Sequence, residues 1–176
     1  MANLTVLGGS VASHGATSDV DSTQQTVFGS LGIDSDKNLY MYVDFQESFI
    51  AGEVVVVNHS YAATQITSTS IGWVGIVVGT VSASDRFGWV QIYGVHTAAL
   101  GTSGITSGSP LVISATSSVG HFDAMTSGVH LIVHGAWART AGETATSPVA
   151  SSDDVGLITV QLNFPYVNGQ LEAGSS

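Results

Sequence analysis

The sequence predicts an all-β fold, a sandwich or barrel of about seven to eight short antiparallel strands that carries an extended N-terminal arm. Short runs of β-branched and aromatic residues alternate with clusters of Gly, Ser, Asn and Asp, which are typical of turns. Several of these runs alternate apolar and polar side chains, as strands with two different faces do. The 21 glycines and the many β-branched residues disfavour helices, and no long window carries a helical apolar stripe.

The first 27 residues are predicted to form the arm. Residues 8–26 are mostly Gly, Ser, Thr, Ala and Asp, and such a stretch cannot bury enough apolar surface to order itself. Leu4, Val6 and Leu7 form a short apolar tip in front of it. We therefore expect a partner to order the arm, with these three side chains as its anchors.

Residues 28–168 are predicted to form the all-β domain. Its first clear strand spans residues 38–45, where side chains alternate between two faces. Residues 53–58 contain four consecutive valines, which indicates a buried strand. In the alternating strand, one face carries Leu39, Met41, Val43 and Phe45, and the other carries Tyr40, Tyr42 and Asp44.

Residues 71–79 and 87–95 are predicted to pair as a hairpin, because a turn-rich segment joins two strand patterns. The first strand contains Gly72, Gly75 and Gly79. Their spacing does not make a phosphate-binding loop, since no Lys follows and no helix is expected to begin there. Glycines inside a strand indicate bulges or a close backbone approach.

Three further strands are predicted at residues 111–115, 129–138 and 155–164. The intervening low-complexity run at residues 97–109 is interpreted as a flexible loop. Pro165 and the Asn-Gly pair after it are expected to stop the last strand. Residues 169–176 are small and polar, and we expect them to form a flexible tail.

The charge composition excludes several partners. Only three residues are Lys or Arg against 13 Asp and Glu, for a net charge of −10. Nucleic acids and anionic membranes both attract proteins through Lys and Arg, so neither is an expected partner. Charged residues make up 9% of the chain, far below the usual share of about 25%. Because interface cores are depleted of charge, other protein is expected to cover part of this surface.

Asp34, Asp36 and Asn38 resemble the opening of a calcium-binding loop. The complete loop requires Gly at its sixth position and Glu at its twelfth, and this chain has Leu39 and Phe45 there. An acidic turn before the strand at residues 38–45 is the simpler interpretation.

His130 and His134 are predicted to lie on one face of one strand, roughly 13 Å apart. That separation is too large for both to bind one zinc ion within a single chain. His59, His96 and His121 could join them only through the fold, and a metal on an oligomer axis is the remaining alternative. The absence of cysteine excludes thiolate sites, and no cofactor or metal is expected.

No arrangement of residues predicts catalysis. The serines of residues 97–109 lack the spacing of a nucleophile elbow. Two close carboxylate pairs, Asp44 with Glu47 and Asp153 with Asp154, could serve glycoside chemistry only if the fold held them across a cleft. Solvated turns explain both pairs more simply, so the chain is not expected to be an enzyme.

The aromatic residues Trp73, Trp89, Trp137 and Tyr93 lie in predicted strands. Aromatic side chains on a sheet face usually pack in the core, and we expect these four there. An inter-subunit contact and a sugar-stacking platform are the two alternatives.

Three segments carry a resemblance to a known family. Residues 86–94, 108–116 and 155–167 resemble small accessory head proteins of tailed bacteriophages, the decoration or cement proteins on the outside of the capsid. The resemblance rests on short β motifs and covers roughly residues 70–167. It implies a homotrimer on local three-fold axes that clamps neighbouring subunits of the major capsid protein, with a terminal arm that adds contacts.

The leading hypothesis is therefore a structural virion protein, made in the host cytoplasm, that binds the outer capsid surface and cements neighbouring capsid subunits. Leu4, Val6 and Leu7 are the candidate capsid-binding residues. A surface-exposed β-sandwich module of a virion that binds host glycans is the alternative. The scarcity of basic residues further predicts that attachment depends little on salt, because salt screens mainly exposed charges.

Overall fold

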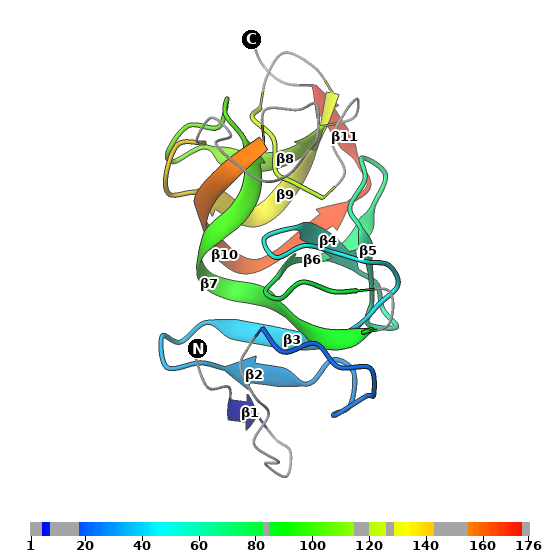
Figure 1. Ribbon diagram of the computed structural model, residues 1–176. Coiled ribbons are helices and arrows are strands. Elements are labelled where there is room, and N and C mark those ends of the chain that lie inside the picture. Colours follow the sequence, from blue (N-terminus) through cyan, green and yellow to red (C-terminus); the bar gives the residue numbers. More distant parts are fainter. Residues whose placement is uncertain are drawn as a thin grey trace.

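The computed structural model confirms the all-β class (Figure 1). The structure describes residues 5–7, 18–82, 85–114, 120–125, 129–142 and 155–173. Within these ranges there is no helix, and eleven strands join one mixed, mostly antiparallel sheet. None of the described elements is a helix long and apolar enough to cross a membrane.

The strands are β1 (Thr5–Leu7), β2 (Leu31–Ile33), β3 (Leu39–Phe45), β4 (Val54–Val57), β5 (Ala62–Gln65), β6 (Ile71–Val77), β7 (Phe87–Thr102), β8 (Pro110–Ser114), β9 (Val129–Ala138), β10 (Val155–Asn168) and β11 (Leu171–Ala173). Their order in the sheet is β1-β2-β3-β5-β4-β6-β7-β10-β9-β11, and β8 pairs with β9.

Five strands close a ring of hydrogen bonds that is not a true barrel. Strand β3 pairs with β5, β5 with β4, β4 with β6, β6 with β7, and β7 again with β3. The β3–β5 pair is parallel, whereas the other four pairs are antiparallel. A cluster of buried side chains fills the ring: Met41, Val43, Phe45, Phe49, Val55, Val57, Ala63, Val77, Val81, Val90 and Ile92.

Strand β4 is buried on both faces, which explains its run of valines. Val55 and Val57 point into the ring, whereas Val54 and Val56 belong to a second and larger core cluster. A strand covered on both faces needs no polar alternation, so its sequence becomes continuously apolar. Strand β4 therefore separates the two cores.

The second core lies between the ring and the strands β8, β9 and β10. Its members from those three strands include Leu111, Leu131 and Ile158, which are all fully buried. The long strands β7 and β10 connect the two cores. The first half of β7 pairs with β3 and β6, and its second half pairs with β10 (Figure 1).

The predicted two-faced pattern of β3 is confirmed. Met41, Val43 and Phe45 point into the ring, whereas Tyr40 and Tyr42 pack outside it against Trp89 and Val6. The hairpin of residues 71–79 and 87–95 is also present as β6 and β7.

The glycines of β6 lie where another segment comes close to the strand, as the sequence predicted. A Cβ on Gly75, for example, would lie 2.8 Å from the Val90 side chain.

Several details of the predicted fold were wrong. The strands are neither all short nor all antiparallel, since β7 has 16 residues, β10 has 14, and β3–β5 is parallel. Strand β7 continues to Thr102 through part of the expected loop at residues 97–109. Strand β10 passes Pro165 and ends only at Asn168, because the proline stands where the pairing with β9 is irregular. Pro is tolerated where no ladder hydrogen bond is required from its nitrogen.

Short strands also lie in the predicted arm and tail. Strand β1 pairs with β2, with Val6 opposite Gly32. Within the same predicted arm, Asp21 bridges Phe87. At the other end of the chain, β11 pairs with β9 through Leu171 opposite Leu131.

Candidate functional site

The most prominent surface feature is a group of exposed aromatic and apolar side chains on β6, β10 and neighbouring segments. Trp73 is 44% exposed, Phe164 is 50% and Tyr166 is 48% exposed. Trp73 and Tyr166 are direct cross-strand partners. We define the aromatic surface as Tyr61, Ile71, Trp73, Tyr93, Phe164 and Tyr166.

Ring contacts join the aromatic side chains of this surface in pairs. Tyr61 stacks on Trp73 with ring centroids 6.1 Å apart, and Tyr93 packs on Phe164 at 5.3 Å. His134 stacks on Tyr166 at 4.9 Å. The six side chains together expose an apolar area on the order of 500 Å², which is in the range of patches that are often functional.

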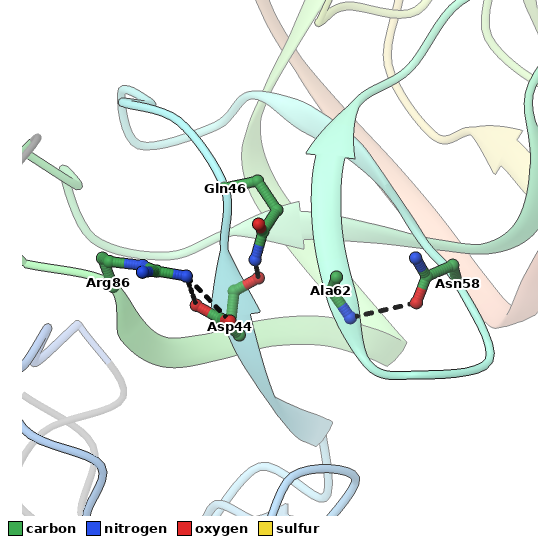
Figure 2. A network of polar contacts seen from close by, with 5 residues as sticks. All are labelled: Asp44, Gln46, Asn58, Ala62 and Arg86. Atoms are coloured by element: carbon green, nitrogen blue, oxygen red, sulfur yellow. Dashed lines mark hydrogen bonds and ion pairs between the residues drawn. The ribbon is translucent and has the colours of Figure 1, made fainter.

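Tyr61 is fixed in place by the turn before β5. The Asn58 side-chain oxygen accepts hydrogen bonds from the amides of Ser60 (2.8 Å) and Ala62 (3.2 Å), and Figure 2 shows the latter. This turn places Tyr61 in the left-handed region at φ 61°, which is unfavourable for a bulky residue. The Tyr61 ring lies against Gly29, where any Cβ would collide with it.

Phe164 is the second aromatic residue in the left-handed region, at φ 48°. It lies where the register between β10 and β9 shifts, between Leu162 and Tyr166. Gly135 of β9 faces this irregularity, and a Cβ there would lie 2.6 Å from the Asn163 carbonyl oxygen. Left-handed aromatic residues cost on the order of 1 kcal/mol or more and persist only where the surrounding structure imposes them.

Three residues of the aromatic surface, Tyr61, Trp73 and Phe164, line an apolar pocket at one mouth of the ring. The pocket has a volume of about 260 Å³ and is lined by Gly29, Leu31, Met41, Tyr61, Trp73, Ile92, Phe164 and Pro165. Met41 and Ile92 belong to the ring core, so the floor of the pocket is the end of that core. We call this cavity the ring-mouth pocket. Trp73 also borders a second hollow, which is larger (about 460 Å³) and more open to solvent and includes Asn58, His59 and Asn168.

No charged side chain lines the ring-mouth pocket. The ion pair between Arg86 and Asp44 lies elsewhere, with 2.9 Å between Nη2 and Oδ1 (Figure 2). Arg86 is about half exposed, and surface pairs of this kind contribute little to stability. The candidate site is therefore uncharged in a strongly acidic protein.

The acidic turn at Asp34 is held by the chain's own hydrogen bonds. The Asp34 carboxylate accepts from the amides of Asp36 and Asn38 at 2.9 Å each, from Asn38 Nδ2 at 3.0 Å and from the Tyr40 hydroxyl at 2.8 Å. Burial raises the pKa of Asp34, but the hydrogen bonds outweigh it and the pKa is lowered. The carboxylate thus organises the turn before β3, as the sequence indicated.

The described histidines do not assemble a metal site. No group of three His, Asp or Glu side chains in the described ranges could hold a metal ion. His130 is buried, whereas His134 stacks on Tyr166 at the edge of the aromatic surface. His59 is exposed and borders the second hollow.

His96 is held beside Gln91 within β7. Gln91 Nε2 donates to the carbonyls of Tyr93 and Val95, both at 3.1 Å, so its Oε1 is the acceptor for His96 Nδ1 at 2.7 Å. Burial lowers the pKa of His96 to about 4, against the opposing effect of a backbone hydrogen bond to Ala98. The ring is therefore neutral at pH 7, with its proton on Nδ1.

This lowered pKa predicts a loss of stability in weak acid. As the pH falls below about 6.5, the unfolded chain protonates His96 while the folded chain does not until about pH 4. The free energy of unfolding should then fall by about 2 kcal/mol between pH 7.5 and pH 5 through this residue. His96→Gln, which keeps a donor for Gln91, should lose most of that dependence in urea unfolding at the two pH values. An identical pH dependence in both proteins would contradict this account.

The carboxylate pairs considered for catalysis are engaged or lie outside the described residues. Asp44 is paired with Arg86, and Glu47 Oε1 accepts a hydrogen bond from the Gln65 amide at 2.7 Å. Asp153 and Asp154 fall outside the described ranges.

The sequence-predicted capsid-binding residues are placed only in part. Val6 is buried against Tyr40, Tyr42 and Trp89. Leu7 pairs with Leu31 in the β1–β2 ladder, and Leu4 lies outside the described residues. The structure therefore places Val6 on the outer side of β3 and β7, away from the ring core.

The expected burial of the aromatic residues is confirmed for Trp89 and was wrong for Trp73, Trp137 and Tyr93. Tyr61, Phe164 and Tyr166 were not singled out from the sequence. Alternation within β10 could have placed Phe164 and Tyr166 on one face, but no local pattern indicates that this face is bare.

Comparison with known proteins gives no relative. No family model matches the chain, and no curated protein or solved structure matches it.

Proposed function

We propose that the chain is a structural virion protein that binds the outer surface of a phage capsid and cements neighbouring subunits of the major capsid protein, as a homotrimer. The observation that carries the proposal is the uncharged aromatic surface on the β-sheet. Aromatic residues are enriched, and charged residues depleted, in the cores of protein interfaces. The sequence resemblance to decoration proteins supplies the kind of partner.

The proposed mechanism is mechanical. Contact with two neighbouring capsid subunits removes apolar surface from water only while both subunits stay in place, so separating them costs free energy. Leu4, Val6 and Leu7 would add contacts from the arm. Because Val6 packs on Tyr40 and Tyr42 in the free chain, its capsid contact would require β1 to leave the body or to bind together with it.

The proposal predicts attachment that is nearly independent of salt. Empty shells assembled from the major capsid protein of the same genome are mixed with the chain and sedimented at 50 mM and 500 mM NaCl. We expect saturable binding with less than about a threefold change in Kd, because salt screens exposed charges and leaves apolar contacts intact. Release at the higher salt would indicate that Lys37, Arg86 or Arg139 carries the attachment.

A second candidate function is glycan binding by a virion surface module. Exposed Trp73 favours it, since an indole face can stack on a sugar ring. The polar side chains near Trp73 do not favour glycan binding, because several of their hydrogen-bonding atoms already have partners within the chain. Asn168 bonds to Gln170 through both its amide atoms, and Asn58 Oδ1 is engaged by its own turn. Saturable glycan-array binding that Trp73→Ala abolishes would establish this function in place of the first.

A further inference from the structure

We infer that the ring-mouth pocket is the receptor for one large apolar side chain of a capsid subunit, which anchors the chain on the shell. This inference rests on the proposed function and adds its contact point. The notable feature is that a closed ring of strands, whose interior is otherwise filled, opens at one mouth into an apolar cavity.

The volume and chemistry of the cavity select the occupant. A cavity of about 150 Å³ lined by apolar side chains binds benzene, so the 260 Å³ of this pocket suit a phenyl or indole group. Its floor consists of Leu31, Met41 and Ile92, which offer no hydrogen bond to a polar ligand. A charged or strongly polar group would lose its hydration there without compensation.

The walls of the pocket are preorganised. Tyr61 and Phe164 both stand in the left-handed region, and both line the pocket. Tyr61 is clamped by its own backbone, because its amide donates to the Asn58 carbonyl at 3.0 Å and its carbonyl accepts from the Asp44 amide at 3.0 Å. Walls that are already fixed lower the entropic cost of binding. Strained residues of this kind cluster at ligand clamps.

The exposed area is too small to hold a second copy through this surface alone, so under the proposed function the surface is one anchor within a contact to a shell subunit. The aromatic surface offers on the order of 500 Å², whereas one partner contributes roughly 800 Å² to a stable interface of standard size. It therefore suits an anchor within a longer contact, which a shell with many subunits supplies. A central apolar side chain in a pocket, surrounded by weaker contacts, is the usual form of a binding hot spot.

Two variants with matched exposure test this assignment. Trp73→Ala removes a wall of the pocket, and Trp137→Ala removes a tryptophan that is similarly exposed (41% against 44%) but does not line the pocket. We expect Trp73→Ala to weaken binding to empty shells by at least about 30-fold and Trp137→Ala by less than about threefold. Thermal unfolding of both variants controls for folding. Phe164→Ala replaces Trp73→Ala if that variant fails to fold, because Phe164 is another aromatic residue that lines the pocket.

A second measurement needs no shell. Indole is titrated into the isolated wild-type chain while NMR follows the side chains that line the pocket. We expect saturable shifts there, lost in Trp73→Ala and retained in Trp137→Ala. The pocket assignment is overturned if these shifts are absent, or if Trp73→Ala binds shells as tightly as wild type.

The proposed function is tested separately. It stands if the wild-type chain binds shells, and it is rejected if the wild-type chain does not. Binding of a glycan at Trp73 would show that the partner at this site is a sugar and not a capsid side chain.

Discussion

Phe45→Ala should lower the free energy of unfolding by about 3–5 kcal/mol, the usual cost of deleting a buried phenyl ring. Phe45 is 1% exposed, lies in the ring core, and packs on Phe49 with ring centroids 5.6 Å apart. The ring core contains side chains from all five strands of the ring, so we expect the cavity left behind not to collapse without moving the backbone. The measurement is urea unfolding followed by circular dichroism.

Phe164→Ala is the matched control, since it deletes the same ring from an exposed position. It should change the free energy of unfolding by no more than about 1 kcal/mol. Equal effects of the two substitutions would contradict the ring, because they would mean that residue 45 is no better enclosed than residue 164.

Asp34→Ala should lower the free energy of unfolding by about 3 kcal/mol. The substitution removes four hydrogen bonds at once and leaves the hydroxyl of buried Tyr40 without its acceptor. The turn before β3 also contains Lys37 in the left-handed region at φ 68°, a conformation that these hydrogen bonds hold. Losing the turn should loosen the start of β3 and its pairing with β2.

The same carboxylate predicts a pH dependence in strong acid. Because the folded pKa of Asp34 lies below the unfolded value of about 3.8, its stabilisation is fully present above that value and is lost as the pH falls through the folded pKa. Asp34→Ala should lack this contribution. Asp36→Ala, an exposed acid in the same turn, should change stability by less than about 0.5 kcal/mol. A large effect of Asp36→Ala with none from Asp34→Ala would reverse the roles assigned to the two residues.

Local patterns predicted the strands that have a strong apolar signature. The alternation of residues 38–45 identified both faces of β3, and the valine run identified β4, because side-chain period and burial are local properties. The three-residue strands β1, β2 and β11 escaped prediction since they are too short to show a period. The parallel β3–β5 pair and the closure of the ring depend on contacts between distant segments, which no window of sequence contains.

The candidate site was harder to predict for a related physical reason. An aromatic residue on a strand is apolar whether it faces a core or the solvent, so Trp73 and Trp89 look alike in sequence. They differ in burial, because other segments of the chain cover Trp89 and leave Trp73 exposed. The left-handed positions of Tyr61 and Phe164 arise from an Asn58 turn and a register shift. The scarcity of charge predicts that other protein covers part of the surface, but it does not indicate which part.

Electron cryo-microscopy of empty shells saturated with the wild-type chain tests the central claim most directly. The account predicts density on the outer capsid surface at junctions between capsid subunits, with the face that carries Trp73 and Phe164 turned toward the capsid protein and a large apolar side chain in the ring-mouth pocket. Shells that remain bare after mixing, or decorated shells in which this face points into solvent, would contradict it.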